Sequence, residues 1–207
     1  PSWSPNGEKI AFLSGSKLFV TSSEGGAPSI LTDNDVGGDV FWKSDSEIFY
    51  NKPGNHNYYI FNIITKKIKL LVSNDKVGFI FKPQLSPDNK DVVIYWNRNP
   101  HDMLTGLWIL SRNDSSQKLL LNSFVLPLKW SKDGKSIYAI NAVKTPQDIL
   151  MVNANTGSTK FIFTLPSGEI ETDGGIDITP DGKTIICAVP ETNSDVWMIE
   201  NFDPDVE

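Results

Sequence analysis

The stretch that decides the fold is PSWSPNGEKIAF, residues 1–12, because the chain repeats it four more times. The later copies are VFWKSDSEIFY (40–50), PQLSPDNKDVVIY (83–95), LKWSKDGKSIYAI (128–140) and GIDITPDGKTIICAV (175–189). Successive copies lie 39 to 48 residues apart when they are aligned on Trp3, Trp42, Leu85, Trp130 and Ile178. A period of roughly 40 to 50 residues is typical of the four-stranded blade of a β-propeller.

Each copy predicts two strands joined by a tight turn. Four of the turns begin with Ser or Thr, carry Asp or Asn third and have Gly or Asn fourth, at 4–7, 86–89, 131–134 and 179–182. These are the residue preferences of a type I turn, in which the hydroxyl bonds the turn backbone. The copy at 40–50 is one residue shorter and lacks both Pro and Gly, so we expect its turn to be distorted.

A second apolar run follows each copy and ends on a polar residue. These runs are KLFVTS (17–22), YYIFNI (58–63), GLWILSR (106–112), DILMVNA (148–154) and DVWMIEN (195–201). Continuous apolar runs of this length indicate strands covered on both faces. A turn and a fourth strand come next in the first four copies, so each unit contains strands A to D, counted from the inside of the ring.

The sequence therefore predicts an all-β protein, a β-propeller of about five four-stranded antiparallel blades. The expected blades span about 1–38, 39–81, 82–125, 126–173 and 174–203, and the last lacks its outer strand. A β-sandwich would share the strand content. The fixed order of turn, apolar run and polar-ended strand in five copies favours the propeller.

The pattern P-x-W-S-P-D-G-x-x-I-A-F, followed by I-W-V-x-D and x-L-T, resembles the TolB-type β-propeller repeat of bacterial proteins. PSWSPNGEKIAF through SILT (1–32) is nearly a full match for one unit, and 42–48 departs most. The resemblance implies a ring of about six to eight blades, in a periplasmic or extracellular module of a larger protein. It also implies binding of proteins or ligands, without catalytic residues in the repeat.

Residue 1 falls inside an expected strand A, and the residues after 201 are too few for a strand D. We therefore expect the chain to form about five blades and to be the C-terminal part of a ring of six or more. Open blade faces at both ends would then favour self-association.

Composition excludes several other classes of function. A net charge of −6 and a pI near 5.0 disfavour a nucleic-acid-binding surface, which needs clustered Lys and Arg. No apolar run approaches the roughly 18 residues that a membrane-spanning helix requires. Cys187 is the single cysteine, so an internal disulfide is excluded. The cysteine content therefore does not indicate in which cellular compartment the protein works.

We expect binding at the face where strand B connects to strand C and strand D to the next strand A. The loops on this face are the longer and more varied ones, which is where rigid scaffolds usually bind partners. A protein or extended peptide is the predicted partner, and the candidate contacts are Asn55, His56, Tyr58, Arg98, His101 and Glu191. Trp96 is an aromatic candidate for a ligand contact, although burial is the favoured interpretation.

The sequence predicts no cofactor, no metal and no catalytic residue. His56 and His101 lack a second ligand at metal-binding spacing. Asp33, Asp35 and Asp39 could offer oxygen ligands to calcium, but an EF-hand loop would need Glu where Ser44 stands. No G-x-S-x-G motif is present. The alternative is the propeller domain of a hydrolase, oligopeptidase-type or glycan-acting, with catalysis supplied elsewhere or at the central cavity.

Overall fold

The computed structural model describes residues 1–32, 36–74, 78–98, 104–165, 176–178 and 184–187, apart from the side chains of Asp39 and Asp177. The described residues form strands and turns and contain no helix. Accordingly, no helix among them is long and apolar enough to cross a membrane. The prediction of an all-β protein is confirmed.

Within the described residues, the strands form four antiparallel four-stranded sheets and one strand pair, each in sequence order. Blade 1 consists of β1 (Ser2–Trp3), β2 (Lys9–Ser14), β3 (Lys17–Ser22) and β4 (Ser29–Thr32). Blade 2 consists of β5 (Gly37–Ser44), β6 (Glu47–Asn51), β7 (Tyr58–Asn62) and β8 (Ile68–Val72). Blade 3 consists of β9 (Phe79–Leu85), β10 (Asp91–Asn97), β11 (Gly106–Ser111) and β12 (Gln117–Leu121). Blade 4 consists of β13 (Val125–Trp130), β14 (Ser136–Asn141), β15 (Asp148–Asn153) and β16 (Thr159–Thr164). The pair β17 (Ile176–Ile178) and β18 (Ile185–Cys187) begins blade 5.

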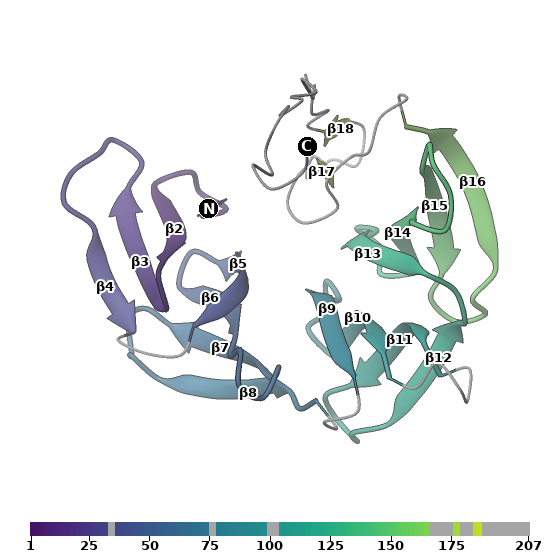
Figure 1. Ribbon diagram of the computed structural model, residues 1–207, viewed down its shortest axis with the longest axis horizontal. Helices are drawn as coiled ribbons and strands as arrows, with labels where there is room; N and C mark the ends of the chain where they lie inside the picture. The colour runs from purple at the N-terminus through teal and green to yellow at the C-terminus, as the bar shows by residue number, and fades with distance from the viewer. Residues whose placement is uncertain (33–35, 75–77, 99–103, 166–175, 179–183, 188–207) are drawn as a thin grey trace, which may run out of the picture.

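The sheets stand side by side around a common centre (Figure 1). Inner strands such as β9 and β13 face this centre, and β4, β8, β12 and β16 lie on the outside (Figure 1). This is the predicted propeller with its four-stranded antiparallel blades. The inner strands β5 and β9 begin at Gly37 and Phe79, two and three residues before the blade boundaries expected from the repeat.

The turn between strands A and B follows the residue types of the repeat. The hydroxyls of Ser4, Ser86 and Ser131 each donate to the side chain two residues on, at 2.7, 2.8 and 2.7 Å. Each also accepts the backbone N–H five residues on, at 2.9, 3.0 and 2.9 Å. The fourth residue has a positive φ in all three turns, at Gly7, Asn89 and Gly134. Gly and Asn are the residues that tolerate this conformation best, which explains their place in the repeat.

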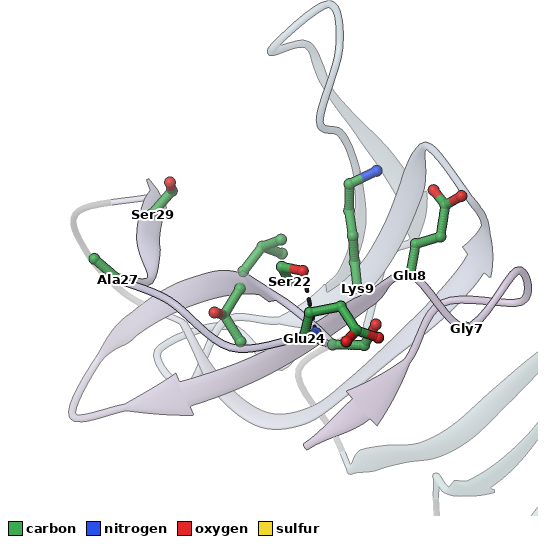
Figure 2. Close-up of a pocket in the computed structure, with 10 residues that line it drawn as sticks. Gly7, Glu8, Lys9, Ser22, Glu24, Ala27 and Ser29 are labelled. Carbon is green, nitrogen blue, oxygen red and sulfur yellow. Dashed lines mark hydrogen bonds between the residues drawn. The ribbon is translucent and has the colours of Figure 1, made fainter.

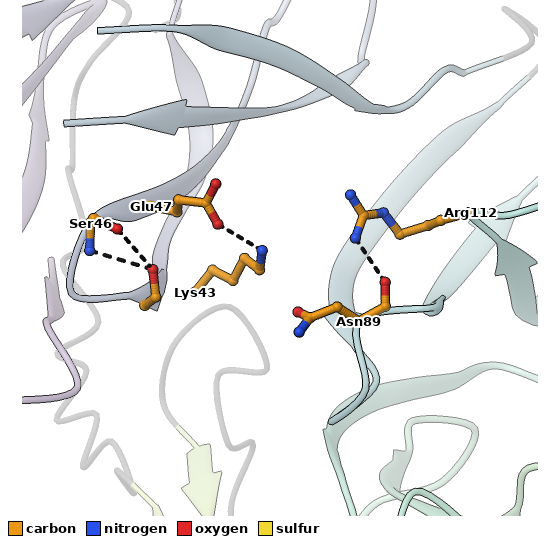
Figure 3. A network of polar contacts seen from close by, with 6 residues as sticks. Lys43, Ser46, Glu47, Asn89 and Arg112 are labelled. Atoms are coloured by element: carbon orange, nitrogen blue, oxygen red, sulfur yellow. Dashed lines mark hydrogen bonds and ion pairs between the residues drawn. The ribbon is translucent and has the colours of Figure 1, made fainter. Parts of the chain in front are cut away.

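The turn of blade 2 is distorted, as its shorter sequence predicts. The ladder between β5 and β6 shifts register between Trp42 and Ser44. Ser44 reaches Ser46 only at 3.4 Å, and Lys43 pairs with Glu47 at 2.6 Å (Figure 3). In the turn of blade 3, by contrast, Arg112 donates to the carbonyl of Asn89 at 2.8 Å (Figure 3).

We expect Ser86→Ala to lower the free energy of unfolding by about 1–2 kcal/mol, because Ser86 is 5% exposed and its hydroxyl has two partners in the turn. Ser44→Ala is the matched control and should cost less than half as much, since its contacts are long. Urea unfolding of both variants measures the difference. Equal losses would show that the shorter hydrogen bonds of Ser86 stabilise its turn no more than the long contacts of Ser44 do.

Apolar clusters between neighbouring blades form the core. Ala11 and Leu18 of blade 1 pack with Ile48 and Tyr50 of blade 2. The next three clusters join blades 2 and 3, blades 3 and 4, and blade 4 with β17 and β18. Blades 2, 3 and 4 therefore each bury one set of alternating side chains against the preceding blade and the other set against the following one.

Anchor tryptophans tie one blade to the preceding one. The indole Nε1 of Trp42 donates to the carbonyl of Ser2 at 3.0 Å, and that of Trp130 donates to the carbonyl of Gln84 at 3.0 Å. Ser2 and Gln84 hold the same place in the repeat, one residue before the anchor. The recurring tryptophan thus fills the gap between two sheets and adds a hydrogen bond across it.

Candidate functional site

One end of the blades, here called the loop face, carries the connections from strand B to strand C and from strand D to the next strand A. Its described connections are residues 15–16, 36, 52–57, 73–74, 78, 98, 104–105, 122–124, 142–147 and 165. All described candidate contacts from the sequence belong to this end of blades 2 and 3. They differ widely, however, in how far they are exposed.

The connection 52–57 holds Asn55 and His56 in a compact turn. The amide of His56 donates to the carbonyl of Lys52 at 2.8 Å, and His56 has a φ of 54°. Its imidazole lies edge-on against the ring of Phe79 in blade 3, with 4.5 Å between the ring centroids. Asn55 is exposed and donates to the Tyr59 hydroxyl at 3.2 Å. His56 and Asn55 are therefore available at the surface.

Tyr58 and Trp96 lie in the core. Their side chains are each 1% exposed and belong to the cluster between blades 2 and 3. Both are at strand ends, where their neighbours in sequence are loop residues, but the blade interface covers the rings. We therefore remove both from the candidate surface contacts.

Asn74, which the sequence did not point to, provides the hydrogen-bond acceptor for the buried indole N–H of Trp96. The indole Nε1 of Trp96 donates to Asn74 Oδ1 at 3.2 Å, while Asn74 Nδ2 donates to the carbonyl of Gly78 at 2.6 Å. The backbone N–H of Asn74 in turn donates to Asn57 Oδ1 at 2.8 Å. This network joins blades 2 and 3 beneath the loop face. Nothing in the short run SNDK marked Asn74 before the tertiary contacts were known.

The side chain of Arg98 packs against two tryptophans of blade 3. Its guanidinium carbon is 4.4 Å from the centroid of the Trp96 ring and 5.3 Å from that of Trp108. One terminal nitrogen donates to Gln117 Oε1 of β12 at 2.9 Å. The Arg98 guanidinium thus lies over the two indoles. These contacts and the hydrogen bond to Gln117 already use part of the surface that it could offer to a partner.

The remaining candidates fall outside what can be described. His101, Glu191, Asp33 and Asp35 lie outside the described residues, and Asp39 lies in β5 with its side chain outside the description. Among the described residues, no group of three His, Cys, Asp or Glu side chains could hold a metal ion.

A row of half-exposed aromatic rings crosses the loop face from blade 2 to blade 4. Phe79, Phe81 and Phe124 are 46%, 37% and 44% exposed. Successive centroid distances along the row His56, Phe79, Phe81, Tyr95 and Phe124 are 4.5, 6.3, 5.9 and 5.1 Å. Tyr95 is the buried ring of the row, and burial raises the pKa of its hydroxyl. The signal in the sequence is the alternation in GFIFKP (78–83), which no other copy repeats in its strand A.

A central cavity of about 570 Å³ opens among the inner strands. Its lining includes Trp3, Phe41, Lys82, Gln84, Lys129 and Ile176. Lys129 Nζ donates to the carbonyl of Ile178 at 2.6 Å.

A second hollow, of about 630 Å³, lies at the opposite end from the loop face, between the β1–β2 and β3–β4 turns of blade 1 (Figure 2). Small polar groups such as Thr21, Ser22 and Ser29 line it, and Ser22 Oγ accepts the amide of Glu24 at 3.2 Å.

Neither a protein-family model nor a curated protein sequence matches the chain. Solved structures do resemble it. TolB from Acinetobacter baumannii superposes with a TM-score of 0.72 and 19% identity over 93% of this chain and 49% of that one. A TolB structure from Agrobacterium tumefaciens gives 0.64 and 19% over 80% and 61%. An oligogalacturonate lyase from Vibrio parahaemolyticus gives 0.57 and 10% over 95% and 71%.

The chain thus spans about half to three fifths of the two TolB structures. At 19% identity, this likeness concerns the fold. Together with the sequential four-stranded sheets around one centre, it shows that this chain has a β-propeller fold like that of the TolB structures.

Proposed function

We propose that this chain is a non-catalytic binding module of a bacterial protein and that its loop face receives an extended peptide segment of a protein partner. The observation that carries the proposal is the row of half-exposed rings at Phe79, Phe81 and Phe124. Exposed apolar patches of this kind mark interaction sites, and aromatic residues contribute much of the energy at protein interfaces.

The geometry of the row favours a peptide over a sugar. Neighbouring rings from Phe79 to Phe124 are tilted by 45–52°, so they form ridges and hollows in place of a flat stacking platform. Side chains on one face of an extended peptide repeat every ~6.7 Å. The centroids of the two exposed rings Phe79 and Phe81 lie 6.3 Å apart, close to that repeat.

His56 would add a polar contact at the blade 2 end of the row. Its ring already rests edge-on against Phe79, so little side-chain entropy remains to be lost on binding. Asn55 lies beside it with an exposed amide. The partner is therefore expected to be apolar along the row and to carry hydrogen-bonding groups near residues 55–56.

Alanine variants at Phe79 and Phe124 test the proposal. Peptides selected from a displayed random 16-residue library should bind the native chain, and each variant should weaken binding by about 10-fold or more, which corresponds to ~1.4 kcal/mol. Phe161→Ala is the matched control, because Phe161 is 57% exposed but lies on the outer strand β16. Peptides that bind all variants alike, or that lose affinity only for Phe161→Ala, would exclude the loop face.

We also propose that the protein works in the periplasm or outside the cell, on the strength of the TolB-like repeat. Cell fractionation with an antibody against this chain tests the location. Recovery with cytoplasmic markers would contradict it.

A further inference from the structure

Leu85 departs from the packing that tryptophans provide at two other blade junctions. Trp42 and Trp130 each lie between their own blade and the preceding one, where the indole donates to a carbonyl of the preceding inner strand. The same position of the repeat in blade 3 holds Leu85, whose smaller side chain carries no hydrogen-bond donor. The junction between blades 2 and 3 therefore lacks the indole that its two neighbours contain.

A phenyl ring takes up part of the space that the missing indole leaves. In the junction between blades 3 and 4, Trp130 packs in one cluster with Val93, which pairs with Gln84 across the sheet. The residue in the place of Val93 in blade 2 is Phe49, which pairs with Phe41. The rings of Phe41 and Phe49 meet edge to face, with centroids 5.1 Å apart and an interplanar angle of 88°. A small residue facing a large anchor is thus exchanged for a large residue facing a small one.

This exchange leaves the junction incompletely filled. A pocket of about 250 Å³ remains where the inner strands of blades 2, 3 and 4 reach their turns, and Leu85 lines it. Leu85 is half-buried, whereas Ile178, the aliphatic anchor of blade 5, is 2% exposed. The other apolar side chains of the lining are those of Phe41, Trp42, Phe49, Pro87 and Trp130. The pocket therefore has mainly aromatic walls and lies at the opposite end of the blades from the loop face.

The pocket also has an acceptor in the place where an indole N–H would bond. The carbonyls of Ser2 and Gln84 accept the indoles of Trp42 and Trp130, both at 3.0 Å. The carbonyl in the same place of the repeat in blade 2 is that of Phe41, which lines the pocket. No indole among the described residues donates to it, since Leu85 stands where the donor would be.

We propose that this pocket binds a small indole compound, which takes the place of the indole that blade 3 lacks and donates its N–H to the carbonyl of Phe41. Apolar walls with one hydrogen-bonding group suit an aromatic ring that carries a single polar atom. Lys43 and Lys129 also line the pocket. Ammonium groups attract the π face of an indole and repel a cationic ligand. The site is separate from the loop face and does not depend on peptide binding there.

Calorimetric titration of the 207-residue chain with two ligands tests the proposal. Indole should bind saturably, with a Kd of about 1 mM or tighter. Benzofuran has the same bicyclic shape with an oxygen in place of the N–H, so it should bind about 10-fold more weakly or less. Equal affinity for the two ligands, or no binding of indole, overturns the proposal. Binding of N-acetyltryptophanamide without binding of indole also overturns it and assigns the pocket to a protein side chain.

A double variant tests the position of the site. Phe49→Val with Leu85→Trp rebuilds the pair that Val93 and Trp130 form at the next junction, so the chain's own indole should fill the pocket. This double variant should bind indole at least about 10-fold more weakly than Phe49→Val alone, which leaves the pocket open. Equal binding by the single and double variants places the ligand elsewhere and overturns the proposal.

Ile64→Trp is the control for adding an indole outside the pocket, because Ile64 is 75% exposed in the β7–β8 turn. It should leave the affinity for indole unchanged, and a 10-fold loss in this variant would contradict the assigned site. Circular dichroism checks that each variant is folded. The comparison of indole with benzofuran uses the native chain, so it decides the proposal even where the double variant does not fold.

Discussion

Gly78→Ala is expected to destabilise the protein by more than about 2 kcal/mol, because there is no room for a side chain at this position. A Cβ at Gly78 would overlap the carbonyl oxygen of Asn97 and would lie 3.0 Å from Cα of Arg98. Both obstacles belong to the backbone and cannot rotate away. The added methyl group would push β9 from β10 where Phe79 pairs with Asn97. Urea unfolding followed by tryptophan fluorescence measures the loss.

Gly54→Ala is the matched control for this prediction. Gly54 also lies in a loop-face connection, but nothing stands within 4 Å of a Cβ there, and its φ is outside the left-handed region. Its substitution should change stability by less than about 1 kcal/mol and could raise it through the unfolded state. Equal unfolding midpoints for the two variants would show that β9 and β10 can separate at little cost.

Asn74→Ala is expected to lower the free energy of unfolding by about 2–4 kcal/mol, since it removes the partner of the buried Trp96 indole and of the Gly78 carbonyl. The indole N–H of Trp96 loses its acceptor, and the carbonyl of Gly78 loses its donor. Asn74 and Trp96 are 7% and 1% exposed, so water cannot readily replace the amide. Thermal and urea unfolding both report this change.

A double-mutant cycle separates the hydrogen bond from the general effect of truncation. Trp96→Phe removes the indole N–H, so Asn74→Ala should cost less in that background than in the native one. Asn55→Ala, at an exposed amide in the adjacent connection, should change stability by less than about 0.5 kcal/mol. Strict additivity of the Asn74 and Trp96 substitutions would contradict the assigned role of their hydrogen bond.

Both substitutions act directly beneath the proposed binding surface. Gly78 and Asn74 hold the start of β9, from which Phe79 and Phe81 project. Loss of this support would leave the rings present but less well ordered. We therefore expect peptide affinity to fall in both variants even under conditions where they remain folded.

The repeat predicts the architecture well because local chemistry repeats five times. Ser86, Asp88 and Asn89 form their turn through contacts within a few residues, so the sequence shows the turn directly. The shortened turn at Lys43 and Ser44 could be predicted as distorted for the same reason. The repeat predicts where a blade begins less closely than it predicts the turns, because β9 is extended to Phe79 by its pairing with Asn97.

The proposed binding surface could be predicted only in outline. Asn55 and His56 lie in the connection between β6 and β7, where the sequence predicts a long varied loop, and their role in binding stays a prediction. Tyr58 and Trp96, however, stand beside loops in sequence and inside an interface in space. Asn74 shows the reverse case, a polar residue of an unremarkable connection that a neighbouring blade draws into the interior.

The sequence by itself determined the blade: the turn residues, the alternating apolar strands and the period all arise from contacts within about 45 residues. Only the tertiary structure decided which aromatic rings are covered and which are left open. That depends on the sheet standing opposite each face, which buries Tyr50 and Trp96 but leaves Phe79, Phe124 and Trp3 partly uncovered. Burial is a property of two blades together, and no single repeat encodes it.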